Sequence, residues 1–135
     1  MSRRRNDRLP SRPLERLWPK TGGIHHFQAA VFAEAKAVAH ALQAAKELHD
    51  RRFNIQVFKA PTTQRPGSMV WMEAATRSGR LVAVGSRHGA NRLGSAISRS
   101  LAAAGSKTPV IRIDAGDLAV ERIMEACLRN LDAPS

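Results

Sequence analysis

The stretch RLVAVGSRHGANRLGSAISRSL, residues 80 to 101, decides the fold that we expect for this chain. It begins with a short apolar run, Leu81 to Val84, which has the length and the valine content of a buried strand. Glycine, serine, arginine and histidine interrupt the run, and apolar residues then recur at helical spacing from about Asn91 to Ala104. A strand, a glycine-containing turn and a helix in this order predict an α/β unit, and such turns often bind a phosphate group.

The segments on either side extend this pattern. Apolar spacings of three and four, with abundant alanine, predict one long helix from Phe27 to about Asp50. Alternation in FNIQVFKAP, residues 53 to 61, predicts a strand, and PVIRI at 109 to 113 predicts another. A short helix at 68 to 78 and a last helix, capped by Asp117 and running to Leu131, complete the order α-β-α-β-α-β-α. The class is therefore α/β, with a three-stranded, at least partly parallel sheet covered by helices.

The length of 135 residues suits one domain. Residues 1–23 are rich in arginine and proline and lack apolar periodicity, so we expect a disordered basic arm, followed by a single α/β domain at residues 24–135. A sheet of three strands has two edges close together. The long first helix, the tail or a second copy of the chain must cover them, which makes a homodimer an expectation.

The charge is unevenly distributed along the chain, which carries a net +11 at pH 7. Residues 51–112 contain eleven basic side chains and one acidic side chain, Glu73, whereas residues 113–135 have a net charge of −3. A field of this sign attracts polyanions and releases counterions on binding. The distribution favours a nucleic-acid partner, DNA or RNA, over its alternatives, which are an acidic partner protein and a merely solvated basic surface.

Other features of the composition bear on the compartment. The single cysteine, Cys127, forms no internal disulfide, which fits a reducing compartment such as the cytoplasm, and we expect it to be a small buried residue. No apolar run reaches the length of about 20 residues that a membrane span requires. The N-terminus lacks the apolar segment of a secretory signal, and its acids and prolines disfavour a mitochondrial presequence.

A search for catalytic and cofactor motifs finds none that is complete. There is no G-x-x-x-x-G-K-[ST], no G-x-G-x-x-G and no cysteine or histidine pair with zinc spacing on a plausible scaffold. Ser86, His88 and Asp114 could form a hydrolytic triad only outside the G-x-S-x-G pattern. We therefore expect a non-catalytic protein without cofactor or metal.

The turn between the central strand and its helix is the candidate binding site. Backbone N–H groups at the start of a helix attract anions, and glycines let a ligand approach the backbone closely. The alternative is that these glycines only shape the turn. The predicted phosphate-binding turn comprises Gly85, Ser86, Gly89 and Asn91, and the predicted nucleic-acid contacts are Lys59, Arg65, Arg87, His88, Arg92 and Arg99.

Residues 54 to 101, NIQVFKAP through SAISRSL, resemble the Alba-type domain, a small basic α/β nucleic-acid-binding fold shared with the stage V sporulation protein S group. The shared features are a strand, a loop, a helix, a strand ending in AVG, and a helix opened by AN. The resemblance implies backbone contacts by Lys59, Arg65, Arg87 and Arg92. Two features depart from that family: its closing β-hairpin is replaced by one short strand, and the expected helix at 27–50 is additional.

Two further resemblances compete with the first. Residues 83 to 113 are similar to the end of universal stress proteins, which implies a small ATP-binding module, although the glycine spacing of that family is not kept. FQAAVFAEAKAVAHAL, residues 27 to 42, more faintly resembles part of a ribonuclease H domain without its catalytic aspartates. Binding of a nucleic-acid phosphate backbone by the basic α/β domain and the arginine-rich N-terminal arm is thus the first hypothesis, with ATP binding and docking on an acidic protein as the alternatives.

Overall fold

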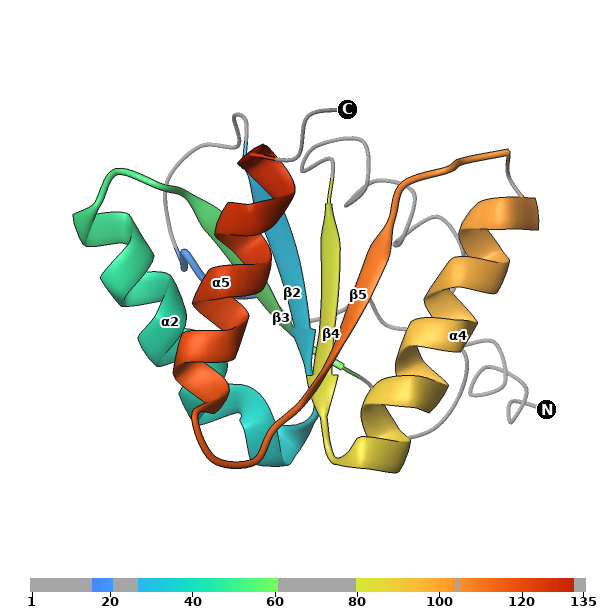
Figure 1. The fold of residues 1–135 in the computed structure, drawn as a ribbon, viewed down its shortest axis with the longest axis horizontal. Coiled ribbons are helices and arrows are strands. Elements are labelled where there is room, and N and C mark those ends of the chain that lie inside the picture. The colour runs from blue at the N-terminus through green and yellow to red at the C-terminus, as the bar shows by residue number, and fades with distance from the viewer. Residues whose placement is uncertain (1–15, 21–26, 61–79, 104, 133–135) are drawn as a thin grey trace, which may run out of the picture.

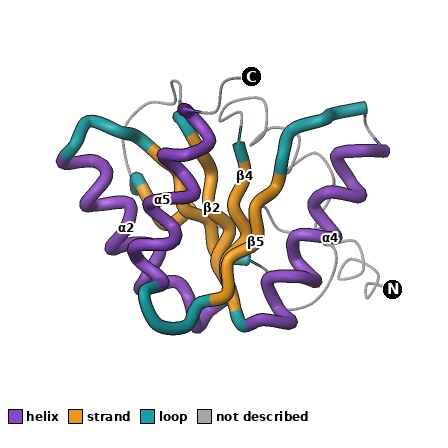
Figure 2. The backbone as a smooth tube through the Cα atoms, viewed as in Figure 1, coloured by secondary structure: helices purple, strands orange, loops and turns teal. Residues whose placement is uncertain are grey.

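The computed structural model describes residues 16–20, 27–60, 80–103 and 105–132, which form three layers (Figure 1). A central sheet carries α2 (Val38–Asp50) and α5 (Ala119–Asp132) on one face and α4 (Arg87–Ala103) on the other. Figure 2 shows the helices on both sides of the strands. The α/β class expected from the sequence is confirmed. Among the described residues, no helix combines the length and the apolar character needed to cross a membrane.

The described sheet has five strands, so the expectation of three is wrong. Its order is β1-β3-β2-β4-β5, where β1 is Arg16–Trp18, β2 is Ala29–Ala33, β3 is Ile55–Lys59, β4 is Leu81–Gly85 and β5 is Val110–Asp114. The strands β3, β2, β4 and β5 run parallel to one another. The edge strand β1 pairs antiparallel with β3, so the sheet is mixed.

The largest correction concerns β2, which lies inside the helix predicted for residues 27–50. All five residues of β2 are buried, because the strand lies in the middle of the sheet with a helical layer on each face. A strand buried on both faces has no polar alternation, and its run of alanine, valine and phenylalanine also matches helical spacing. Helix begins only after Glu34, as a 3-10 turn at Ala35–Ala37 that leads into α2.

The strand β1 belongs to the segment expected to be a disordered arm. Arg16 lies opposite Phe58 and Trp18 opposite Val57 in the register with β3. The Trp18 ring also packs edge-on against His49 of α2, with 5.9 Å between ring centroids. The peptide bond between Trp18 and Pro19 is cis. Residues 16–18 of this segment therefore form a strand at the edge of the sheet.

The other boundaries differ less from expectation. Strands β3, β4 and β5 lie where the alternation and the apolar runs predicted them. Helix α4 begins at Arg87 instead of Asn91, since the glycine at 89 is accommodated within its first turn. Helix α5 begins two residues after Asp117, at Ala119. The predicted helix at 68–78 lies outside the described residues.

The core is divided by the sheet into two clusters. Towards α2 and α5, one cluster joins the alternate strand residues Val31, Val57, Val82 and Ile113 to apolar residues of both helices. Towards α4, the second cluster is smaller: Ala30, Phe32, Leu81, Ile97 and Leu101. Phe32 stacks on Phe58 in that cluster, with ring centroids 5.1 Å apart and ring planes at 12°. The α4 layer therefore depends on few large side chains.

We expect the substitution Phe32→Ala to lower the free energy of unfolding by about 3–5 kcal/mol, because it empties the centre of the smaller cluster. Phe58→Ala should lower the free energy of unfolding by less, because the Phe58 side chain is only half-buried in the folded protein and so removes less apolar surface from water. Urea denaturation of both variants measures the difference. An equal loss of unfolding free energy in the two variants would contradict the conclusion that Phe32 is the centre of the smaller cluster.

Cys127 is fully buried, as expected, and its burial raises the pKa of the thiol from 9.0 to about 12. The folded protein should therefore react slowly with a thiol reagent near neutral pH and rapidly once unfolded. A folded-state pKa above the unfolded value also means that stability falls as the pH rises above 9.0 towards 12. Cys127→Ala should remove this part of the pH dependence, which is checked by comparing both proteins in urea at several alkaline pH values.

Candidate functional site

The carboxyl ends of β2 and β4 meet at a topological switch point. The chain leaves β2 towards α2 on one face of the sheet and leaves β4 towards α4 on the other face. These two strands are neighbours, so the loops that follow them diverge to opposite faces of the sheet. Open α/β sheets bind ligands outside the carboxyl ends of their strands at such points.

In this chain the side chain of Glu34, which directly follows β2, lies at this switch point. Its Oε1 accepts a hydrogen bond from the backbone N–H of Ser86 at 3.1 Å, and the Ser86 hydroxyl lies 3.5 Å from the same oxygen. The Ser86 Oγ in turn accepts a hydrogen bond from the N–H of Gly89 at 3.1 Å, which caps the start of α4. A carboxylate at this position also interacts favourably with the partial positive charge of the helix N-terminus.

The two glycines of the predicted phosphate-binding turn make room for this carboxylate. A Cβ atom on Gly85 or on Gly89 would collide with the Glu34 side chain. The close approach inferred from these glycines is therefore real, but the group that approaches is a carboxylate of the same chain. Phosphate binding by Gly85, Ser86, Gly89 and Asn91 stays a prediction, and a phosphate there would have to displace Glu34.

Helix α4 has a strongly basic exposed surface. Along its 17 residues it contains no aspartate or glutamate. It exposes Arg87, His88, Arg92 and Arg99, which are four of the six predicted contacts. We call these four side chains the α4 basic face. The structure thus places these predicted residues on one element.

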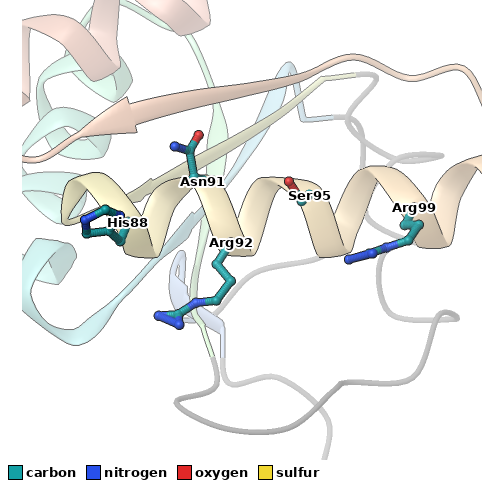
Figure 3. Close-up of a pocket in the computed structure, with 5 residues that line it drawn as sticks. All are labelled: His88, Asn91, Arg92, Ser95 and Arg99. Atoms are coloured by element: carbon teal, nitrogen blue, oxygen red, sulfur yellow. The ribbon is translucent and has the colours of Figure 1, made fainter.

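An open hollow of about 470 Å³ lies on the same helix, lined by His88, Asn91, Arg92, Ser95 and Arg99. Figure 3 shows Arg92 and Arg99 extending from one side of α4 and Asn91 from the opposite side. The two arginines are seven residues apart, which corresponds to two helical turns. A long anion lying along the helix can therefore meet both guanidinium groups.

Arg112 of β5 adds a further cation beside α4, and the sequence analysis did not select it. Its Nη2 donates a hydrogen bond to Ser95 Oγ at 3.4 Å. Gly94 allows this, because a Cβ there would collide with the Arg112 side chain. The signal for Arg112 was its position in β5 on the face of the sheet that α4 covers, and it could be read only once the register of the sheet was known.

The other predicted contacts are not brought to this helix. Lys59 is exposed at the end of β3, which β2 separates from β4. Arg65 lies outside the described residues. Glu34, which the analysis also missed, could have been found only after β2 was recognised as a strand with an acidic residue directly behind it.

The opposite layer differs in charge. Helix α5 exposes Glu121 and Glu125, and α2 ends in a turn containing Glu47 and Asp50. Exposed cations such as Lys46 and Arg122 lie in the same layer as these acids, so it carries both signs of charge, whereas α4 is purely basic. Within the described part of the chain, no group of three or more histidine, cysteine, aspartate or glutamate side chains is arranged to hold a metal ion.

We expect Gly89→Ala to change the free energy of unfolding in opposite directions with and without the Glu34 side chain. In the native background it should destabilise the fold, because the added methyl group displaces the carboxylate from Ser86. In a Glu34→Ala background it should stabilise the fold by about 0.5–1 kcal/mol, since alanine is the better helix former and the collision is gone.

A double-mutant cycle in urea measures this coupling. Gly116→Ala serves as the control, because a Cβ there meets no atom within 4 Å, and its effect should be equal in both backgrounds. The same destabilisation by Gly89→Ala with and without Glu34 would contradict the contact.

Comparison with known proteins identifies a fold neighbour and no family. No protein-family model matches the chain, and no curated protein sequence is significantly similar to it. Among solved structures, the chain is similar to one described as "Split gene transketolase, inactive beta4 tetramer", where beta4 is part of that description and not a strand label. The TM-score is 0.58 and the sequence identity is 23%. The match covers 76% of this chain and 34% of the other, so the present chain spans about a third of that neighbour's length. At this identity the likeness shows the α/β fold alone.

Proposed function

We propose that this protein is a non-catalytic nucleic-acid-binding protein that contacts the phosphate backbone through the α4 basic face. The observation that supports this most directly is that three arginines and one histidine are exposed along α4 without any acidic residue in that helix. The high net charge of +11 is in line with a polyanionic partner.

The spacing of the arginines suits a phosphate backbone. Seven residues of helix separate Arg92 from Arg99, which is about 10 Å along the axis. One strand of a duplex carries a phosphate about every 3.4 Å along its axis, so the two guanidinium groups span about three phosphates. Arg112, held beside Ser95, adds a third guanidinium to the same surface.

The composition of α4 argues against strong sequence preference. The helix contains no phenylalanine, tyrosine or tryptophan on which a base could stack, and Asn91 is its only amide side chain. Arginine contacts to phosphate position a protein on nucleic acid without specifying the sequence. Binding should therefore depend on salt more than on the order of bases.

ATP binding at the turn after β4 has less support than nucleic-acid binding. The Glu34 carboxylate lies against Ser86, Gly85 and Gly89, so its negative charge would repel a nucleotide phosphate at that place. The α4 basic face is separate from this contact and has no carboxylate of its own helix.

The test compares two charge-matched double variants. Arg92→Ala with Arg99→Ala should weaken binding to a mixed-sequence duplex and reduce the log–log salt slope by about 0.9 for each lost phosphate contact. Lys46→Ala with Arg51→Ala removes the same charge from exposed positions at the end of α2 and should change both quantities much less. Fluorescence anisotropy titrations at several salt concentrations measure affinity and slope.

Two outcomes would overturn the proposal. One is the absence of duplex and single-strand binding at about 50 mM salt, where electrostatic binding is strong. The other is an equal loss for the two double variants, which would mean that only total charge matters and α4 is not the contact surface.

A second candidate is docking of the same face on an acidic partner protein. The observation that favours it is the same set of exposed cations on the acid-free helix α4, which would attract an acidic protein surface as well as a nucleic acid. Polyglutamate, used as a model acidic polymer, discriminates between the two. Binding of polyglutamate as tight as that of a duplex of equal charge would favour the protein partner, and clearly tighter duplex binding would favour nucleic acid.

A further inference from the structure

The outer edge of β5 is open within the described part of the chain. Strand β5 pairs there with β4 alone, and Figure 1 shows it uncovered between α5 and α4. The carbonyl of Pro109 and the N–H of Ala115 bond to β4. Because bonding directions alternate along a strand, the backbone groups of the three residues at 110, 112 and 114 point away from β4, and the Asp114 carbonyl there also accepts a hydrogen bond from the N–H of Gly116 at 2.9 Å. Such an edge is a template for a further strand.

Apolar residues in β5 and in the segment that follows it are incompletely buried. Ile111, Ala115 and Val120 are only half-buried, and Leu118 is 62% exposed, the exposed large hydrophobic residue of the described chain. Leu118 also has a φ of 64°, a conformation that is unfavourable for a branched side chain. A backbone outlier that presents an apolar side chain to water points to a surface that is covered in use.

We propose that β5 is a homodimer interface, in which a second copy of this chain pairs its own β5 antiparallel to it about a two-fold axis at Ile113. Charge complementarity selects this register. It sets Arg112 opposite Asp114 of the partner subunit, and by symmetry Asp114 opposite the partner's Arg112. Both positions have outward-pointing backbone groups and lie on one face of the sheet, so they form hydrogen-bonded pairs with opposite charges.

The neighbouring registers fit less well. A two-fold axis at Arg112 would set two arginines directly opposite each other, which is destabilising. A two-fold axis at Asp114 would likewise set two aspartates directly opposite each other. With the axis at Ile113, Ile111 comes opposite the partner's Ala115, and the apolar edge residues cover each other.

This interface does not depend on the proposed nucleic-acid function. The interface has one consequence for nucleic-acid binding, because a two-fold axis between antiparallel strands stands perpendicular to the sheet. The α4 helices of both copies would lie on the same side of one continuous sheet. The two proposals can fail independently. The dimer is tested by the mass of the protein in solution, and nucleic-acid binding is tested by titrations at several salt concentrations.

The experiment measures the mass of the full chain in solution by light scattering over a range of protein concentrations. We expect twice the chain mass of 14.8 kDa for the native protein. Arg112→Glu sets acidic residues opposite each other and Asp114→Arg sets arginines opposite each other, so each variant alone should have half the native mass. Mixed together, the two variants should form a heterodimer, because every facing pair is then of opposite charge.

Native mass spectrometry identifies the heterodimer, and circular dichroism verifies folding of each variant. Leu118→Glu is a second variant at an exposed side chain, where folding does not depend on the change, and it should also have half the native mass. A native protein that has the monomer mass at every concentration overturns the proposal. So does a dimer that survives Leu118→Glu and both charge reversals, because its interface then lies elsewhere and the charges at 112 and 114 serve only to protect the edge.

Discussion

The structure depends on the burial of β2 on both faces. Its odd-numbered residues, among them Val31, pack towards α2 and α5, and Ala30 and Phe32 pack towards α4. Its two neighbours, β3 and β4, pair with it in parallel. A strand in this position needs apolar residues throughout, and both helical layers exist because each must cover one of its faces.

The position of β2 also explains why an acidic side chain lies at the start of α4. The chain turns at Glu34 at the end of β2, next to the end of β4, where α4 begins on the opposite face. The N-terminus of α4 has unpaired N–H groups and a partial positive charge, and the Glu34 carboxylate satisfies the N–H of Ser86. Small residues at 85 and 89 are required because that carboxylate lies against the backbone. Capping and the packing of two layers therefore depend on one contact between segments 52 residues apart.

With the turn occupied from within the chain, the surface that remains for a partner is the outer side of α4 and the adjacent edge at β5. The same residue, Arg112, belongs to both, since it bonds to Ser95 on α4 and stands at an outward-pointing position of the edge strand. Helix α4 contributes cations without acids, whereas α5 on the other face exposes Glu121 and Glu125. A polyanion and a second copy of the chain would therefore use neighbouring surfaces that share Arg112.

The sequence by itself determined the features that rest on local pattern. The α/β class, the strands β3, β4 and β5, the amphipathic α4 and its arginines follow from periodicity within windows of 5 to 17 residues, and burial of Cys127 follows from its chemistry. Only the tertiary structure decided the rest. Ala29–Ala33 is a strand because two layers bury it, and Arg16–Trp18 is a strand because β3 offers an edge. Glu34 meets Gly85 and Gly89 because β2 and β4 are neighbours, a long-range contact that no window along the chain contains.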